Sequence, residues 1–251
     1  GRIQGVYKNG ERNKAPIAGK NLTMAIDMGL QEYGEQLMIK KLGSIVAIEP
    51  STGEILALIS SPSYDPHLLV GRERSKNYNA LLKDPFKPLF DRPLMAMYPP
   101  GSTFKLVNGL IYQQEGVITE DTRFSCSMGY YYSRTRKLGC HPHPNNLDLR
   151  ESVQHSCNAY YGHGLKGLLD SPPSGISTTE SYNHWRNHVL SMGFGKKLGV
   201  DFPNEKGGLI LESNRYDRIY GKNKWKSSTI ISIAIGQGEV LATPIQTANL
   251  A

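Results

Sequence analysis

A serine and a lysine three residues apart are the side chains in this sequence whose spacing most directly suggests catalysis. Ser102 and Lys105 lie in the segment YPPGSTFK. Residues three apart share one face of a helix, so the hydroxyl and the amine can meet. Burial and the positive end of a helix dipole both lower the proton affinity of a lysine, so Lys105 could accept the proton of Ser102. The serine would then be a nucleophile for acyl transfer.

The residues just before Ser102 favour this interpretation. The segment YPPG at 98–101 is a stiff turn, because each proline fixes its own φ. It would hold Ser102 in the first helical turn, where the backbone N–H is available to a developing oxyanion. The S-x-x-K pattern alone is weak evidence, since a serine and a lysine on a helix surface also satisfy it. A second short pattern, S-x-N, occurs at Ser75, Ser156 and Ser181.

A second group of chemically active side chains is a cluster of cysteines and histidines. Cys126, Cys140 and Cys157 fall within 32 residues, and His141 and His143 lie between them. Three thiolates and one imidazole complete a tetrahedral zinc site. His143 is the preferred imidazole because a C-x-x-H spacing chelates more easily than adjacent residues, and His141 is the alternative. A disulfide with one free thiol, or three unrelated buried thiols, would also account for the cysteines.

The helix that begins at Ser102 must position the serine and the lysine, and its sequence predicts a buried rod. Residues 102–115 are mostly apolar, and Gly116 ends the run. We therefore expect this helix to run through the core. Its apolar positions are Phe104, Leu106, Val107, Leu110 and Ile111.

Capping patterns and apolar runs predict the neighbouring elements. Asp27 precedes a helix that we expect to close at Gly43, and Asp148 with Glu151 forms a capping box for a helix through Gln154. The unbroken hydrophobicity of an expected hairpin predicts a sheet covered on both faces by helices. The other expected elements are a strand at 21–26, the two strands of the hairpin at 44–48 and 54–59, a helix after Ser156, a loop at 171–183, a buried strand at 230–235, and a helix that starts at Thr243, Pro244 and Gln246.

The composition predicts a globular protein with one large domain. The chain has 251 residues, of which 39% are hydrophobic and 20% charged, and no apolar window approaches the roughly 18 residues of a membrane span. The formal net charge of +7 favours anionic surroundings. Nucleic acid is not expected, because no long block of like charges and no aromatic-interleaved basic motif is present. We expect residues 1–20 to be a linker or the end of a preceding module, and residues 21–251 to be the domain.

The two serine motifs together resemble the active site of penicillin-binding proteins. YPPGSTFK at 98–105 and SCN at 156–158 are similar to the S-x-x-K and second serine motifs. GSIVAIEPSTGEILALISSPSYDP at 43–66 resembles the first hairpin of class B transpeptidases, and IGQGEVLATPIQTANLA at 235–251 resembles the segment after their second motif. The resemblance spans about residues 20–251. YPPGSTFK with GQGEVLATP is most similar to the elongation group, penicillin-binding protein 2.

This resemblance implies a fold and an activity. The fold would be α/β in the broad sense (α+β), with a mostly antiparallel sheet flanked by helices and an all-helical subregion that carries the active-site helix. The activity would be D,D-transpeptidation, in which Ser102 attacks the D-Ala-D-Ala carbonyl of a peptidoglycan stem peptide and passes the acyl group to a second stem peptide. Lys105 would be the base, Ser156 would relay protons, and Asn158 would bind the acyl-donor backbone and hold the lysine.

One departure from the family is large. The third motif, lysine then threonine or serine then glycine, is absent from the sequence. We therefore expect a transpeptidase domain truncated at its C-terminal end, and a fragment that is inactive or nearly so by itself. The family implies an N-terminal pedestal and membrane anchor outside this chain, on the periplasmic side of the bacterial inner membrane.

The resemblance also supports the metal site and implies partners. Some elongation-type members carry a metal in the loop before their second motif, so a structural zinc would brace that motif from behind; no cofactor is implied for catalysis. The implied partners are stem peptides, β-lactam antibiotics and a membrane glycan polymerase of the elongation machinery. Two other functions stay open. One is a β-lactamase or D,D-carboxypeptidase that uses water as acceptor, and the other is a non-enzymatic penicillin-sensing or wall-binding domain.

Overall fold

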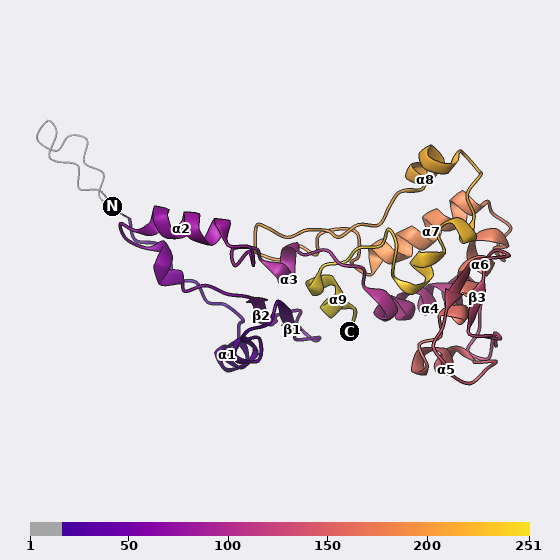
Figure 1. Ribbon diagram of the computed structural model, residues 1–251, viewed down its shortest axis with the longest axis horizontal. Helices are drawn as coiled ribbons and strands as arrows, with labels where there is room; N and C mark the ends of the chain where they lie inside the picture. The colour runs from indigo at the N-terminus through magenta and orange to yellow at the C-terminus, as the bar shows by residue number, and fades with distance from the viewer. Residues whose placement is uncertain (1–16) are drawn as a thin grey trace, which may run out of the picture.

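The computed structural model describes residues 17–251, which form an elongated molecule (Figure 1). A hairpin and two helices lie at one end, and a cluster of helices lies at the other. The helices are α1 Met28–Leu37, α2 Arg74–Lys83, α3 Arg92–Met95, α4 Phe104–Gln114, α5 Leu149–Gln154, α6 Asn158–Asp170, α7 Thr178–Ser191, α8 Ser213–Tyr220 and α9 Pro244–Leu250. The strands are β1 Gly43–Ile48, β2 Ile55–Ser61, β3 Gly129–Tyr131 and β4 Lys137–Gly139, and the 3-10 helices are η2 Pro66–Leu69, η3 Gly101–Thr103, η4 Ser227–Thr229 and η5 Ile231–Ile235. Within the described part of the chain, no helix combines the length and apolarity needed to cross a membrane.

The predicted hairpin is confirmed. Strands β1 and β2 pair antiparallel, with Ile45 opposite Ile59 and an irregularity between Ala47 and Ile48. Helix α1 packs on β2, and helices α3 and α9 pack on β1. Gly34 lets α1 approach β2, because a Cβ at this position would lie 2.7 Å from the Ile59 side chain.

The N-terminal predictions are partly confirmed. Asp27 caps α1 as predicted, since its carboxylate accepts the Leu30 N–H at 2.9 Å. The strand predicted at 21–26 is wrong: these residues are mostly exposed and pair with no strand. The predicted helix end is also wrong, because Lys40 adopts a left-handed conformation, with φ of 60°, and turns the chain well before Gly43. Most of the linker predicted at 1–20 lies outside the described residues.

Helix α4 forms the centre of the helical end of the molecule. Phe104, Val107 and Ile111 are at most 1% exposed, and they pack in one core with residues of α6 and α7. The expectation that Leu106 and Leu110 fill the same core is wrong: they are 47% and 55% exposed. Leu110 lies beside Met192 and Leu250, where it lines an open recess.

A second correction concerns the start of α7. The loop predicted at 171–183 is too long, because α7 begins at Thr178. Ser177 and Glu180 form a capping box there, with the serine hydroxyl and the glutamate carboxylate each satisfying the other residue's backbone N–H. The S-x-x-E pattern was present in the sequence and identifies this helix start.

A third correction concerns the strand predicted at 230–235. The apolar residues of 231–235 are buried as expected, but the segment forms the 3-10 helix η5. A short apolar run is compatible with either element, and here no neighbouring strand pairs with the segment. A side chain of α4 binds two of its carbonyl groups instead.

Three further helix predictions are confirmed. Asp148 and Glu151 form the capping box of α5, and Thr243 and Gln246 form the capping box of α9. A helix, α6, follows Ser156. The fold class is confirmed as well: α helices dominate, the paired strands are antiparallel, and the S-x-x-K pair lies at the head of a helix in an all-helical core.

Candidate active site

The turn that carries Ser102 is held by the segment at 236–242. Tyr98 and Ala242 exchange two backbone hydrogen bonds, of 2.9 and 2.8 Å, and the Gly101 N–H donates to the Gly236 carbonyl at 2.9 Å. Gly101 itself has a positive φ of 62°, which a glycine tolerates without strain. These contacts place Ser102 in η3, directly before α4, with its side chain exposed.

The amine of Lys105 is the polar centre of the site. It donates to three oxygens of the second serine motif: Ser156 O at 2.6 Å, Ser156 Oγ at 2.9 Å and Asn158 Oδ1 at 2.6 Å. Three acceptors match the three protons of an ammonium group. Among the described hydrogen bonds none joins Lys105 to Ser102, so the predicted first-motif contact is replaced here by contacts to the second motif. Catalytic hydrogen bonds of this kind often form only when a substrate is present.

Burial changes the proton affinity of Lys105. The residue is 2% exposed, and desolvation lowers the pKa of its amine to about 8, although attraction to Cys140 and Cys157 partly opposes this shift. At pH 7 about a tenth of such lysines are neutral, against about one in three thousand at the ordinary pKa of 10.5. Lys105 can therefore act as a general base near neutral pH.

The backbone of Ser156 is held in an uncommon conformation. Its φ is 49°, in the left-handed region that residues other than glycine seldom occupy. Ser156 lies between α5 and α6, and both its carbonyl and its hydroxyl bind Lys105. Strain of about 1–3 kcal/mol is typical of such positions and is commonly found at functional sites.

Asn158 connects the lysine to the cysteine loop. Its side-chain oxygen accepts from Lys105, and its side-chain nitrogen donates to the Gly139 carbonyl at 2.7 Å. Its backbone N–H donates to Cys140 Sγ at 3.1 Å, as does the N–H of Ala159 at 3.3 Å. The loop that carries Cys140 thus fixes both the side chain and the backbone of the second motif.

The cysteine and histidine residues converge behind this motif. The ligand atoms of Cys126, Cys140, His143 and Cys157 lie within 4.8 Å of one another, and all three cysteines are free thiols. His143 Nδ1 donates to the Pro144 carbonyl at 2.7 Å, which leaves Nε2 as the acceptor nitrogen; Nε2 is buried and has no hydrogen-bond partner. A buried imidazole lone pair facing three thiols matches the donor set of a structural zinc site.

The same cluster distinguishes the candidate ligands. His141 is exposed and is not a member of the cluster, whereas His143 is. A hydrogen bond between the Cys140 and Cys157 thiols, with a sulfur–sulfur distance of 3.9 Å, lowers the pKa of Cys140 to about 4 and raises that of Cys157. Cys140 is therefore the cysteine that most readily becomes a thiolate.

Two residues near the site were missed by the sequence analysis. Gly139 binds Asn158 through its backbone carbonyl, and no side-chain pattern can reveal such a contact. Asn108 is fully buried in α4. An asparagine within an otherwise apolar helix was a readable signal, since a buried amide needs partners.

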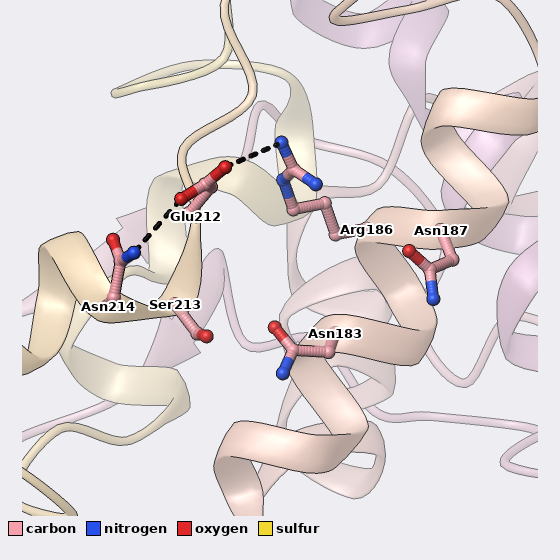
Figure 2. Close-up of a pocket in the computed structure, with 6 residues that line it drawn as sticks. All are labelled: Asn183, Arg186, Asn187, Glu212, Ser213 and Asn214. Carbon is pink, nitrogen blue, oxygen red and sulfur yellow. Dashed lines mark hydrogen bonds and ion pairs between the residues drawn. The ribbon is translucent and has the colours of Figure 1, made fainter.

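A polar recess between α7 and α8 is separate from these motifs (Figure 2). Arg186 points toward Glu212 across it, with 3.9 Å between Nη2 and Oε1, and also donates through Nε to the Leu211 carbonyl at 3.1 Å. None of the predicted site residues lines this recess. Its lining residues are Asn183, Arg186, Asn187, Glu212, Ser213 and Asn214.

Comparison with known proteins gives one family over most of the chain. Residues 43–251 match the family described as "Penicillin binding protein transpeptidase domain". The peptidoglycan D,D-transpeptidase MrdA of Acinetobacter baumannii is 34% identical over 242 residues, which cover 94% of this chain and 34% of that protein. The chain thus spans about a third of the length of this curated relative.

Solved structures agree with this result. The Pseudomonas aeruginosa PBP2 in complex with WCK 5153 is 32% identical with a TM-score of 0.79, over 94% of this chain and 51% of that one. The imipenem acyl-enzyme complex of penicillin-binding protein A from M. tuberculosis is 25% identical with a TM-score of 0.69, over 88% of this chain and 49% of that one.

The first prediction concerns the proton affinity of Lys105. In the protein labelled with ¹³C-lysine, the ε-carbon resonance of Lys105 should titrate with a midpoint near pH 8, because burial disfavours the ammonium form. The resonance is assigned by its loss in Lys105→Arg. A midpoint of 10 or above would show that the amine is not desolvated.

The second prediction separates the backbone of Ser156 from its hydroxyl. Ser156→Gly and Ser156→Ala both remove the hydroxyl, but only glycine adopts a φ of 49° without strain. The glycine variant should therefore be more stable than the alanine variant by about 1 kcal/mol in urea unfolding. Equal stabilities would mean that the left-handed conformation is not kept in solution.

Proposed function

The chain belongs to the penicillin-binding protein transpeptidase family, and from this premise we propose that it is part of a serine D,D-transpeptidase of the penicillin-binding protein 2 type. The enzyme cross-links peptidoglycan stem peptides through an acyl-enzyme at Ser102, and β-lactams acylate the same serine. The observation that carries the proposal is the contact of the buried Lys105 amine with both Ser156 and Asn158. The chain spans about a third of its curated relative, so the activity proposed here is that of the whole enzyme.

Lys105 is the base of the acylation step. In its neutral form the amine keeps two protons, which can remain on Ser156 O and Asn158 Oδ1, the two shortest contacts. The lone pair then accepts a proton from a hydroxyl, and Ser156 Oγ lies at 2.9 Å. This arrangement supports a relay in which Ser156 passes protons between the lysine and the reacting groups.

The acylation step balances with these residues alone. Ser102 Oγ bonds to the carbonyl carbon of the penultimate D-alanine, and its proton passes to Lys105. The peptide bond to the terminal D-alanine then breaks, and the departing nitrogen takes a proton delivered through Ser156. In the second half-reaction the amine of another stem peptide bonds to the ester carbonyl carbon and loses a proton through Ser156 to Lys105. The bond from the acyl carbon to Ser102 Oγ then breaks, and Ser102 Oγ takes this proton back from Lys105.

Asn158 both holds the lysine and offers a contact for substrate. Its side-chain NH₂ group has two protons, of which one is used by the Gly139 carbonyl. The second can bind a carbonyl of the acyl-donor peptide. Gly139 therefore sets the direction in which this amide faces.

The oxyanion of the tetrahedral intermediate needs more than this chain provides. The Ser102 backbone N–H, in the 3-10 turn before α4, is one donor. We propose that the second donor, and the group that binds the substrate carboxylate, belong to the family's third motif, which these 251 residues do not contain. The domain organisation we propose is accordingly a linker or pedestal end at 1–20 and part of the transpeptidase domain at 21–251.

A structural zinc ion is part of the proposal. Cys126, Cys140, His143 and Cys157 would hold it in a closed tetrahedral shell, and the ion would supply rigidity, not catalytic chemistry. The support is the unpartnered His143 Nε2 facing three free thiols. Because Cys157 lies between Ser156 and Asn158, such a shell would fix the second motif from the side opposite Lys105.

The partners and location follow from the family and remain proposals. The substrate partners are stem peptides that end in D-Ala-D-Ala, and β-lactam antibiotics compete with them. We further propose a membrane glycan polymerase of the elongation machinery as protein partner, with the enzyme anchored at the periplasmic face of the bacterial inner membrane. The basic net charge of +7 suits an anionic wall polymer.

The third prediction tests the nucleophile. In the longer protein that includes the third motif, fluorescent penicillin should label the wild type, and Ser102→Ala should abolish labelling because no acyl-enzyme can form. Thr103→Ala is the matched control: it removes the adjacent exposed hydroxyl, which only bonds to the Pro100 carbonyl, and should label within about threefold of wild type.

Product analysis with donor and acceptor peptides completes this test. Transfer to the acceptor amine supports the proposal, whereas hydrolysis without transfer would indicate a carboxypeptidase or β-lactamase. Acylation with no turnover would indicate a sensing domain. Label on a residue other than Ser102 would contradict the proposal.

The fourth prediction concerns the metal. Native mass spectrometry of the chain, purified without chelators, should find one zinc ion, which Cys157→Ser and His143→Ala should lose and His141→Ala should keep. A chelator should lower the unfolding temperature by roughly 5–10 °C, since each kcal/mol is worth about 2–4 °C in a chain of this size. The assignment would be overturned if the wild type carried no metal, or if His141→Ala lost zinc to the same extent as His143→Ala.

A further inference from the structure

A single amide in the middle of α4 joins the active-site helix to the segment that supports the serine turn. Asn108 is polar but 0% exposed, and its neighbours along the helix are apolar. A buried amide is costly unless its hydrogen bonds are made. Both ends of the Asn108 amide make hydrogen bonds, and the partners come from η5 and α7.

The partners of Asn108 fix the direction of its side chain. Nδ2 donates to the carbonyls of Ile233 and Ala234, each at 3.0 Å, and Oδ1 accepts from Trp185 Nε1 at 2.8 Å. Carbonyls only accept and an indole N–H only donates, so the amide cannot be reversed. Asn108 therefore binds η5 from one end and α7 from the other.

The segment that Asn108 holds is also the segment on which the serine turn rests. Gly236 follows η5 directly, with a φ of 64°, and its carbonyl accepts the Gly101 N–H at 2.9 Å. The approach is close: a Cβ on Gly236 would overlap the Gly101 carbonyl oxygen and lie 2.5 Å from Phe104 Cβ. A small shift of η5 therefore moves Gly101, the residue next to Ser102.

We infer that Asn108 is a positioning residue for Ser102. It acts through η5 and Gly236 on Gly101, so that α4, which begins two residues after the serine, also holds the segment that supports the serine turn. This inference rests on the proposed role of Ser102 as nucleophile. Asn108 touches no substrate and no reacting atom, and its effect is to keep the serine hydroxyl at the distance that acylation requires.

The structure offers a matched control at Trp185. Trp185 donates a hydrogen bond to the oxygen of the Asn108 amide. The hydrogen bonds from Asn108 to η5 use the amide nitrogen instead. Trp185→Phe removes that hydrogen bond and leaves both bonds to η5. Asn108→Leu, which is similar in volume, removes all three.

The experiment compares both variants in the longer protein that includes the third motif, well below their unfolding temperatures. Amide hydrogen exchange at Gly101 reports its bond to Gly236, and the kinetics of labelling by fluorescent penicillin give the maximal acylation rate and the affinity of the first complex separately. Asn108→Leu should speed Gly101 exchange and lower the maximal acylation rate, each by at least about tenfold, with the affinity unchanged. Trp185→Phe should change both by less than about threefold.

Three outcomes would overturn the inference. The first is that Asn108→Leu keeps the wild-type rates of Gly101 exchange and of acylation, and the second is that Trp185→Phe changes these two rates as much as Asn108→Leu does. The third is that Asn108→Leu weakens the affinity of the first complex but keeps the maximal acylation rate. If Asn108→Leu does not fold, Gly236→Ala replaces it, because the added Cβ displaces Gly101 from the other side; unchanged acylation in that variant contradicts the inference. If the wild type is not acylated at Ser102, the proposed function fails, and Gly101 exchange still decides whether Asn108 controls the turn.

Discussion

The site depends on one buried amine that must satisfy its hydrogen bonds across two elements distant in the sequence. Lys105 is carried by α4, and every oxygen it binds comes from the junction of α5 and α6, more than fifty residues later. A buried charged amine without these partners would cost several kcal/mol. This requirement couples the two serine motifs and explains why Ser156 keeps a strained backbone, since that conformation brings its carbonyl to the lysine.

The cysteine cluster and the active site are parts of one arrangement. Cys140 receives the backbone N–H groups of Asn158 and Ala159, while the neighbouring Gly139 receives the Asn158 side chain. Lys105 binds the same asparagine from the opposite side. The loop before the second motif therefore fixes the residue that holds the Lys105 amine. On the first motif the comparable support comes from the segment at 236–242, through its backbone bonds to Tyr98 and Gly101.

Local patterns in the sequence predicted the elements that are locally determined. Asp27, the Asp148–Glu151 pair and the Thr243–Gln246 pair each cap a helix where expected, because a cap depends on residues within one turn. The start of α7 was missed although its S-x-x-E pattern is local, whereas two other failures were tertiary. Residues 231–235 form a 3-10 helix in which Asn108 binds two of the carbonyls, and Leu106 stays exposed although the helix is mostly apolar. The motifs brought Ser102, Lys105, Ser156 and Asn158 forward as candidates. No spacing, however, predicts that the Lys105 amine binds Ser156 and not Ser102.

The central claim is that Lys105 and Ser156 act together as one proton-transfer unit for Ser102. A double-mutant cycle on the acylation rate tests it most directly, using Lys105→Ala, Ser156→Ala and the double variant in the longer protein. Residues that act as a unit are strongly non-additive, so the double variant should be no more than about threefold slower than the slower single variant. Losses that multiply in full would contradict the account, because the two groups would then work independently.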